Sequence, residues 1–63
     1  MPRTELHFYE DNIGGALAII DRLNVMARLT DDEWILRDIA ECIALAGRIA
    51  ARNRARMSAR RQE

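Results

Sequence analysis

A helix-start signal lies near the middle of this 63-residue chain, in the sequence LTDDEW of residues 29–34. Thr30 and Glu33 have the spacing of a capping box, in which each side chain accepts a hydrogen bond from the backbone N–H of the other. Leu29 and Trp34 have the spacing of a hydrophobic staple, and the acidic run suits the positive end of a helix dipole. Because apolar helical patterns lie on both sides, the sequence predicts a helix, a tight corner and a second helix.

The part before the corner predicts an extended arm and then a helix. Residues 4–9 alternate in a strand-like pattern, although they also fit the three-and-four spacing of a helix. Gly14 and Gly15 argue against one continuous helix, because each glycine costs about 1 kcal/mol in a helix interior. We therefore expect an arm over residues 1–10 and a first helix over about residues 12–28, with a polar Asp-Asn pair available as its cap.

The part after the corner at residues 29–31 predicts a long helix over about residues 31–57 and a basic tail over residues 58–63. Apolar residues recur there in steps of four and three, as in helices that pack together. The residues expected in the core of the hairpin and its dimer are Ile13, Ile20, Leu23, Ile35, Ile39, Cys42, Ala46 and Ile49. The residues that widen the second-helix stripe on one side are Leu36, Ile43, Ala50 and Met57. Gly47 at the stripe edge would let a neighbouring helix approach closely.

The short length predicts self-association. Chains below roughly 70–80 residues usually need disulfides, a metal or oligomerisation to be stable. Cys42 is the one cysteine, so it cannot form an internal disulfide, and with His7 it is too little for a structural zinc site. We expect an all-α fold in which an antiparallel helical hairpin dimerises into a four-helix bundle, with the extended arm at its amino terminus.

Composition excludes a membrane protein. The apolar run Ala16–Ile20 is far shorter than the roughly 20 residues that span a bilayer, and the first residues are too polar to begin a secretory signal. We expect a cytoplasmic location, where a single reduced thiol is ordinary. All ten basic residues are arginine, which suggests a GC-rich bacterium or a phage or plasmid within one.

The sequence carries no recognisable catalytic arrangement. It has no glycine-rich phosphate loop, no HExxH motif and no nucleophile elbow, so we expect no enzyme activity, cofactor or small-molecule substrate. Asp31, Asp32 and Glu33 are explained by the helix start, which leaves no metal site. Cys42 fits a small apolar residue of the stripe, and His7 a surface or packing residue.

Charge is uneven along the chain, although the net charge is zero. Residues 1–46 carry nine acids and four arginines, whereas residues 47–63 carry six arginines and one acid. Arg52, Arg56 and Arg60 are therefore candidate contacts to a polyanion such as nucleic acid. The alternatives are an acidic protein surface, or simply cations that suit a helix carboxyl terminus.

Trp34 points to a second kind of surface, because it lies away from the apolar stripe. Exposed Trp and Arg are typical anchors of protein interfaces. The residues predicted to bind a protein partner are Tyr9, Trp34, Arg37, Glu41, Leu45 and Arg48. The alternative is that Trp34 only packs on Leu29 or on the amino-terminal arm, which would leave Leu45 exposed and unexplained.

Two resemblances rest on this layout. In size and architecture the chain resembles small phage-encoded hairpins that bind host regulators, such as the quorum-sensing anti-activators. This resemblance implies a protein-binding inhibitor. The stretch Leu29–Cys42, with acids at the corner and a cysteine in the second helix, is similar to the Rop family of plasmid copy-number proteins. That likeness implies RNA binding by the first helices, where the outer face here offers Arg22 and Arg28 beside Asp21. Strand-like residues 4–9 followed by two helices also suggest a ribbon-helix-helix DNA binder.

Overall fold

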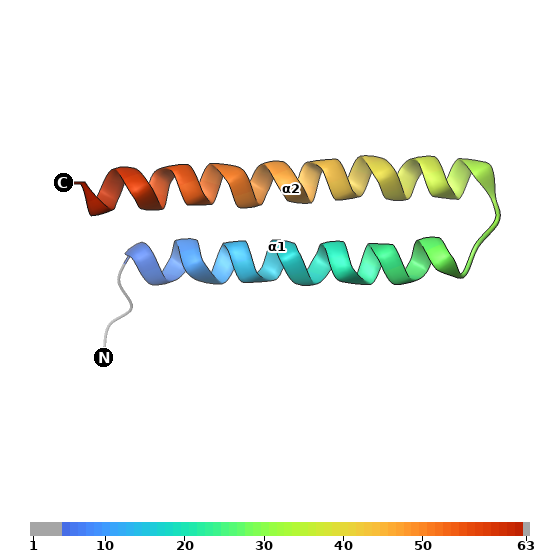
Figure 1. The fold of residues 1–63 in the computed structure, drawn as a ribbon, viewed down its shortest axis with the longest axis horizontal. Helices are drawn as coiled ribbons and strands as arrows, with labels where there is room; N and C mark the ends of the chain where they lie inside the picture. The colour runs from blue at the N-terminus through green and yellow to red at the C-terminus, as the bar shows by residue number, and fades with distance from the viewer. Residues whose placement is uncertain (1–4, 63) are drawn as a thin grey trace.

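Two antiparallel helices form a hairpin in the computed structural model, which describes residues 5–62 (Figure 1). Helix α1 spans Glu5–Arg28 and helix α2 spans Glu33–Arg61, so the expected helical hairpin is confirmed. No strand occurs within residues 5–62. The hairpin is a single layer, with principal extents of 47, 22 and 11 Å. Both of its broad faces are therefore uncovered.

Helix α1 begins at Glu5, so the predicted extended arm is wrong for residues 5–10, and residues 1–4 lie outside the described part. The ribbon that a ribbon-helix-helix fold requires is absent from these residues. Packing against α2 explains the difference, because Leu6 and Tyr9 continue the three-and-four spacing and are half-buried. That packing outweighs the cost of about 1 kcal/mol for each interior glycine.

The corner spans residues 29–32, and α2 is capped by Asp32 in place of the predicted Thr30–Glu33 capping box. The Asp32 Oδ1 atom accepts hydrogen bonds from the backbone N–H groups of Trp34, at 2.9 Å, and Ile35, at 3.2 Å. Thr30 instead accepts from the Asp32 N–H with its hydroxyl oxygen, at 3.1 Å. The predicted staple is also absent, since Leu29 is 81% exposed and Trp34 is 72% exposed.

The seam between the helices follows one side of the predicted stripe. On α2 the buried residues are Ile39, Ala46 and Ala50, and the half-buried ones are Ile43, Gly47, Asn53 and Met57. On α1, Ala16 is buried, and the half-buried residues are Leu6, Tyr9, Ile13, Ile20, Leu23 and Ala27. Small side chains at the centre let the two helices lie close together. The seam thus includes three of the four residues that widen the predicted stripe, namely Ile43, Ala50 and Met57, whereas Leu36 is exposed.

Three of the expected core residues, Ile35, Cys42 and Ile49, are exposed on the single hairpin. The glycines do not mark close helix contacts either, because a Cβ atom added at any of the three would meet nothing within 4 Å. Gly47 was expected to allow close approach, and within one chain it does not serve that purpose. The buried core of the described chain therefore consists of one isoleucine and three alanines.

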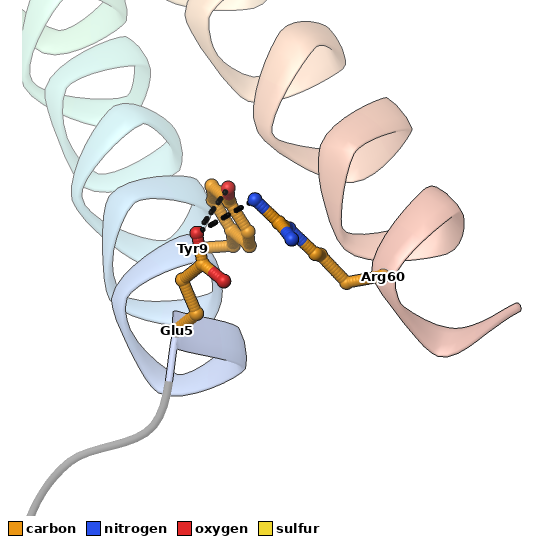
Figure 2. A network of polar contacts seen from close by, with 3 residues as sticks. All are labelled: Glu5, Tyr9 and Arg60. Carbon is orange, nitrogen blue, oxygen red and sulfur yellow. Dashed lines mark hydrogen bonds and ion pairs between the residues drawn. The ribbon is translucent and has the colours of Figure 1, made fainter. Parts of the chain in front are cut away.

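Polar contacts fix the alignment of the helices at the open end, opposite the corner. The Asn12 side-chain amide donates to Oδ1 of Asn53 at 3.1 Å, and the Asn53 amide donates to the Ile49 carbonyl at 2.7 Å. Arg60 forms an ion pair with Glu5 at 3.1 Å, and Tyr9 donates to the same carboxylate oxygen at 3.4 Å (Figure 2). These pairs place the start of α1 beside the end of α2.

Candidate protein-binding surface

One edge of α2 gathers five of the six residues predicted to bind a protein. We call this surface the outer strip of α2, and it consists of Trp34, Arg37, Glu41, Leu45 and Arg48. All five are exposed, and steps of three and four residues keep them along one side of the helix. The strip mixes an aromatic ring, an aliphatic side chain and charges of both signs, which is the composition of a protein interface.

Trp34 and Arg37 are organised as a pair before any partner arrives. The Arg37 guanidinium lies 5.2 Å from the centre of the Trp34 ring, within range of a cation–π contact. The Asp32 cap fixes the backbone of Trp34 in the first turn of α2. A Trp ring that is 72% exposed yet held at its backbone and covered by an arginine is preorganised for binding.

Leu45 supplies a second apolar contact on the strip, because its side chain is 52% exposed. It lies eleven residues from Trp34, which is three helical turns or about 16 Å. The two side chains can therefore act as separated anchors along one straight edge. The alternative that Trp34 packs on Leu29 is wrong, since both side chains are largely exposed.

Tyr9 does not belong to this surface. It is half-buried near the open end of the hairpin, where its hydroxyl donates to Glu5 (Figure 2). About 30 Å of helix separates it from the level of Trp34 at the corner. The structure therefore gives Tyr9 a place in the network with Glu5 and Arg60 and leaves five residues on the predicted binding surface.

The arginines at the end of α2 are partly neutralised by α1. Arg60 pairs with Glu5 at 3.1 Å, and Arg61 pairs with Glu10 at 3.6 Å. Arg52 and Arg56, the other candidate polyanion contacts, are exposed. Because all four side chains of these ion pairs are about half exposed, each pair contributes little stability, roughly 0–1 kcal/mol. The pairs favour a role in closing the open end over phosphate binding.

A second candidate surface lies on one broad face of the hairpin. A shallow groove of about 230 Å³ runs between the helices there, and its lining includes Gly15, Ala16, Ile19, Ala46 and Ile49. The sequence predicts Ile49 as a core residue and gives Ile19 no role. Neither position indicated an open groove, because the rotation of each helix was not fixed by the pattern.

The described residues offer few other chemical sites. Within residues 5–62, no three His, Cys, Asp or Glu side chains are grouped so that they could hold a metal ion. Neither described helix has the length and apolarity needed to cross a membrane. A depression lined by Asp21, Asn24, Val25, Ala27 and Arg28 lies on α1 alone, so it is open surface.

Comparison of the chain with protein-family models, curated proteins and solved structures finds no match.

Proposed function

We propose that this chain is a small non-enzymatic regulator that binds and inhibits a host bacterial protein, such as a transcription regulator. The observation that carries the proposal is the preorganised Trp34–Arg37 pair on an exposed edge of α2, with Leu45 three turns away. Burial of a large exposed Trp side chain against a partner is favourable, because it removes a large apolar surface from water.

The regulator acts as a cytoplasmic homodimer in which two hairpins form a four-helix bundle. Support comes from the small core, since one isoleucine and three alanines are the buried residues in the described chain. The outer strip of α2 lies at the edge of the hairpin, so two copies can pair by their broad faces and still present two strips. Two equivalent strips would let one dimer engage a dimeric target.

The test compares the full-length chain with a Trp34→Ala variant as bait in a nuclease-treated bacterial lysate. The original chain should retain a specific protein, and Trp34→Ala should lower its capture at least tenfold. Val25→Ala, which shortens an exposed side chain on α1, is the matched control and should retain the protein normally. Nuclease treatment separates this result from a nucleic-acid binder, whose capture would depend on RNA or DNA.

Circular dichroism of the same variants distinguishes binding from folding. Trp34→Ala should keep its helicity and melting temperature because the ring is 72% exposed. If Trp34→Ala unfolds the chain, Trp34 is structural and the outer strip of α2 is the wrong surface. If capture requires intact RNA or DNA and survives Trp34→Ala, the alternative of a nucleic-acid-binding regulator replaces the proposal.

A further inference from the structure

The broad face that holds the groove carries a continuous row of exposed apolar side chains. Ile19 and Ile49 line the groove together. Met26 lies seven residues beyond Ile19, and Cys42 and Ile35 lie seven and fourteen residues before Ile49, so two-turn steps place them on the same face. We call these five residues the apolar face. Each of them is exposed on the single hairpin, four of them at 46–53%.

The five side chains alternate between the two helices. Asn12 lies level with Asn53, and Glu5 lies level with Arg60. In that alignment the order from the middle of the hairpin towards the corner is Ile49, Ile19, Cys42, Met26 and Ile35. The row covers both helices, and Asp11 and Asn12 line the groove at the end of the row nearer the open end. The opposite broad face differs, because its large exposed residues Leu17 and Leu36 stand about 18 Å apart along the hairpin.

The total exposed area indicates what size of partner is missing. The chain exposes 5165 Å². A compact protein of 7.2 kDa exposes about 4,100 Å², so this chain exposes about 1,000 Å² more. A standard protein interface buries about 800 Å² on each partner. The excess therefore matches one face covered by one partner of similar dimensions, and stable domains usually pack two such layers.

We propose that the apolar face is covered by the apolar face of a second copy of this chain, with the two rows running in opposite directions. This inference deepens the proposed function, since it rests on the homodimer proposed there. Charge sets the direction. Residues 11–19 and 46–54, around the Ile49 end of the row, carry three arginines and one acid, whereas residues 28–38 at the corner, around its Ile35 end, carry four acids and two arginines. Opposed copies bring ends of opposite sign together, and copies in the same direction bring like charges together.

The face also explains why three expected core residues are exposed on one hairpin. Ile35, Cys42 and Ile49 are surface residues of the hairpin and become core residues of the dimer. Four residues of the outer strip of α2 stay free in this arrangement, because Trp34, Arg37, Glu41 and Arg48 lie farther around the helix. Gly15 in the groove lacks a side chain that would hold the second copy away.

Cys42 is a native reporter for this interface, because its thiol is exposed on the single hairpin. The unmodified chain is labelled with an iodoacetamide dye over a range of protein concentrations, and sedimentation equilibrium gives the dimer fraction in the same samples. The labelling rate should fall in proportion to the dimer fraction. Raising the salt concentration from low to moderate should increase the dimer dissociation constant, because the paired ends have opposite charge.

Two arginine substitutions test the face directly. Ile19→Arg should weaken dimerisation at least tenfold. Leu17→Arg places the same charge two residues away on the opposite face, at a similarly exposed position, and should leave the dissociation constant within twofold. If Ile19→Arg does not fold, the Cys42 labelling of the unmodified chain decides the question.

Different failures have different meanings. The apolar face is the wrong interface if the chain dimerises but the Cys42 labelling rate does not change with protein concentration. The same holds if Leu17→Arg weakens the dimer as strongly as Ile19→Arg. In both cases the proposed homodimer stands. If moderate salt tightens the dimer, the two copies point in the same direction. A folded monomer at all concentrations overturns both this inference and the dimer on which it rests.

Discussion

Helix α2 carries two apolar stripes that look alike in sequence and differ in the structure. One stripe, which includes Ile39 and Ala46, is buried against α1, whereas the other, with Ile35, Cys42 and Ile49, is exposed. Members of each stripe recur every seven residues. The buried stripe is mostly alanine at its centre, which lets α1 approach closely. The exposed stripe contains two bulky residues, Ile35 and Ile49. The closest contact within one chain is thus made by small residues, and larger ones are left for contacts outside it.

The largest effect that tests this comparison is the removal of equal side chains from the two stripes. Ile39→Ala should lower the free energy of unfolding by about 2–5 kcal/mol at every protein concentration, because Ile39 is 5% exposed and its loss leaves a cavity. Ile35→Ala removes the same atoms from a side chain that is 46% exposed. Its cost should be below about 1 kcal/mol in dilute protein and should grow with concentration, as dimer formation adds stability by mass action.

Urea unfolding of both variants over a wide range of protein concentrations provides the measurement. Equal costs at every concentration would mean that the two stripes are equivalent, and the seam described here would be wrong. A free-energy cost for Ile35→Ala that does not change with protein concentration would instead mean that the exposed stripe takes no part in dimerisation.

The sequence predicted the hairpin because its signals are local. The acidic corner and the three-and-four spacing after it each depend on a few neighbouring residues, and Asp32 and Glu33 begin α2 close to the expected position. The outer strip of α2 was predictable for the same reason, since helical spacing alone separates Trp34 and Leu45 from Ile39.

The choice between the stripes was not predictable from α2 alone. Ile35, Ile39, Cys42, Ala46 and Ile49 fit one heptad pattern, and a rotation of less than half a turn exchanges the facing residues. The rotation is fixed by pairing with α1, which depends on residues far apart in the chain.

Helix α1 was predicted too short for a related reason. The expected start near residue 12 depends on the local helix propensity of Gly14 and Gly15. The contacts between Asn12 and Asn53 and between Glu5 and Arg60 instead join residues more than forty positions apart. The place of Tyr9 depends on the same helix. Its hydrogen bond to Glu5 requires residues 5–10 to be helical, so the expected extended arm could not predict it.

The cap of α2 offers an intermediate effect, because it sets where the helix begins and so helps determine which stripe faces α1. Asp32→Ala should lower the free energy of unfolding by about 1 kcal/mol, since the carboxylate accepts from two backbone N–H groups. Asp31→Ala is the matched control, because it removes the same charge from a residue outside the helix and should cost less. Thermal unfolding followed by circular dichroism measures both. A larger loss of unfolding free energy for Thr30→Ala than for Asp32→Ala would mean that Thr30 caps α2, as the capping box predicts.

The smallest effect is the difference between alanine substitutions at two adjacent glycines of α1, of which Gly15 lines the groove and Gly14 does not. Each alanine substitution should stabilise the helix by about 1 kcal/mol in dilute protein, because a Cβ atom meets nothing within 4 Å at either position. At high concentration Gly14→Ala should keep this gain. Gly15→Ala should lose part of it, since the new methyl group then stands between the two copies. Unfolding free energies at both concentrations measure the difference, and equal gains throughout would mean that no second copy approaches Gly15.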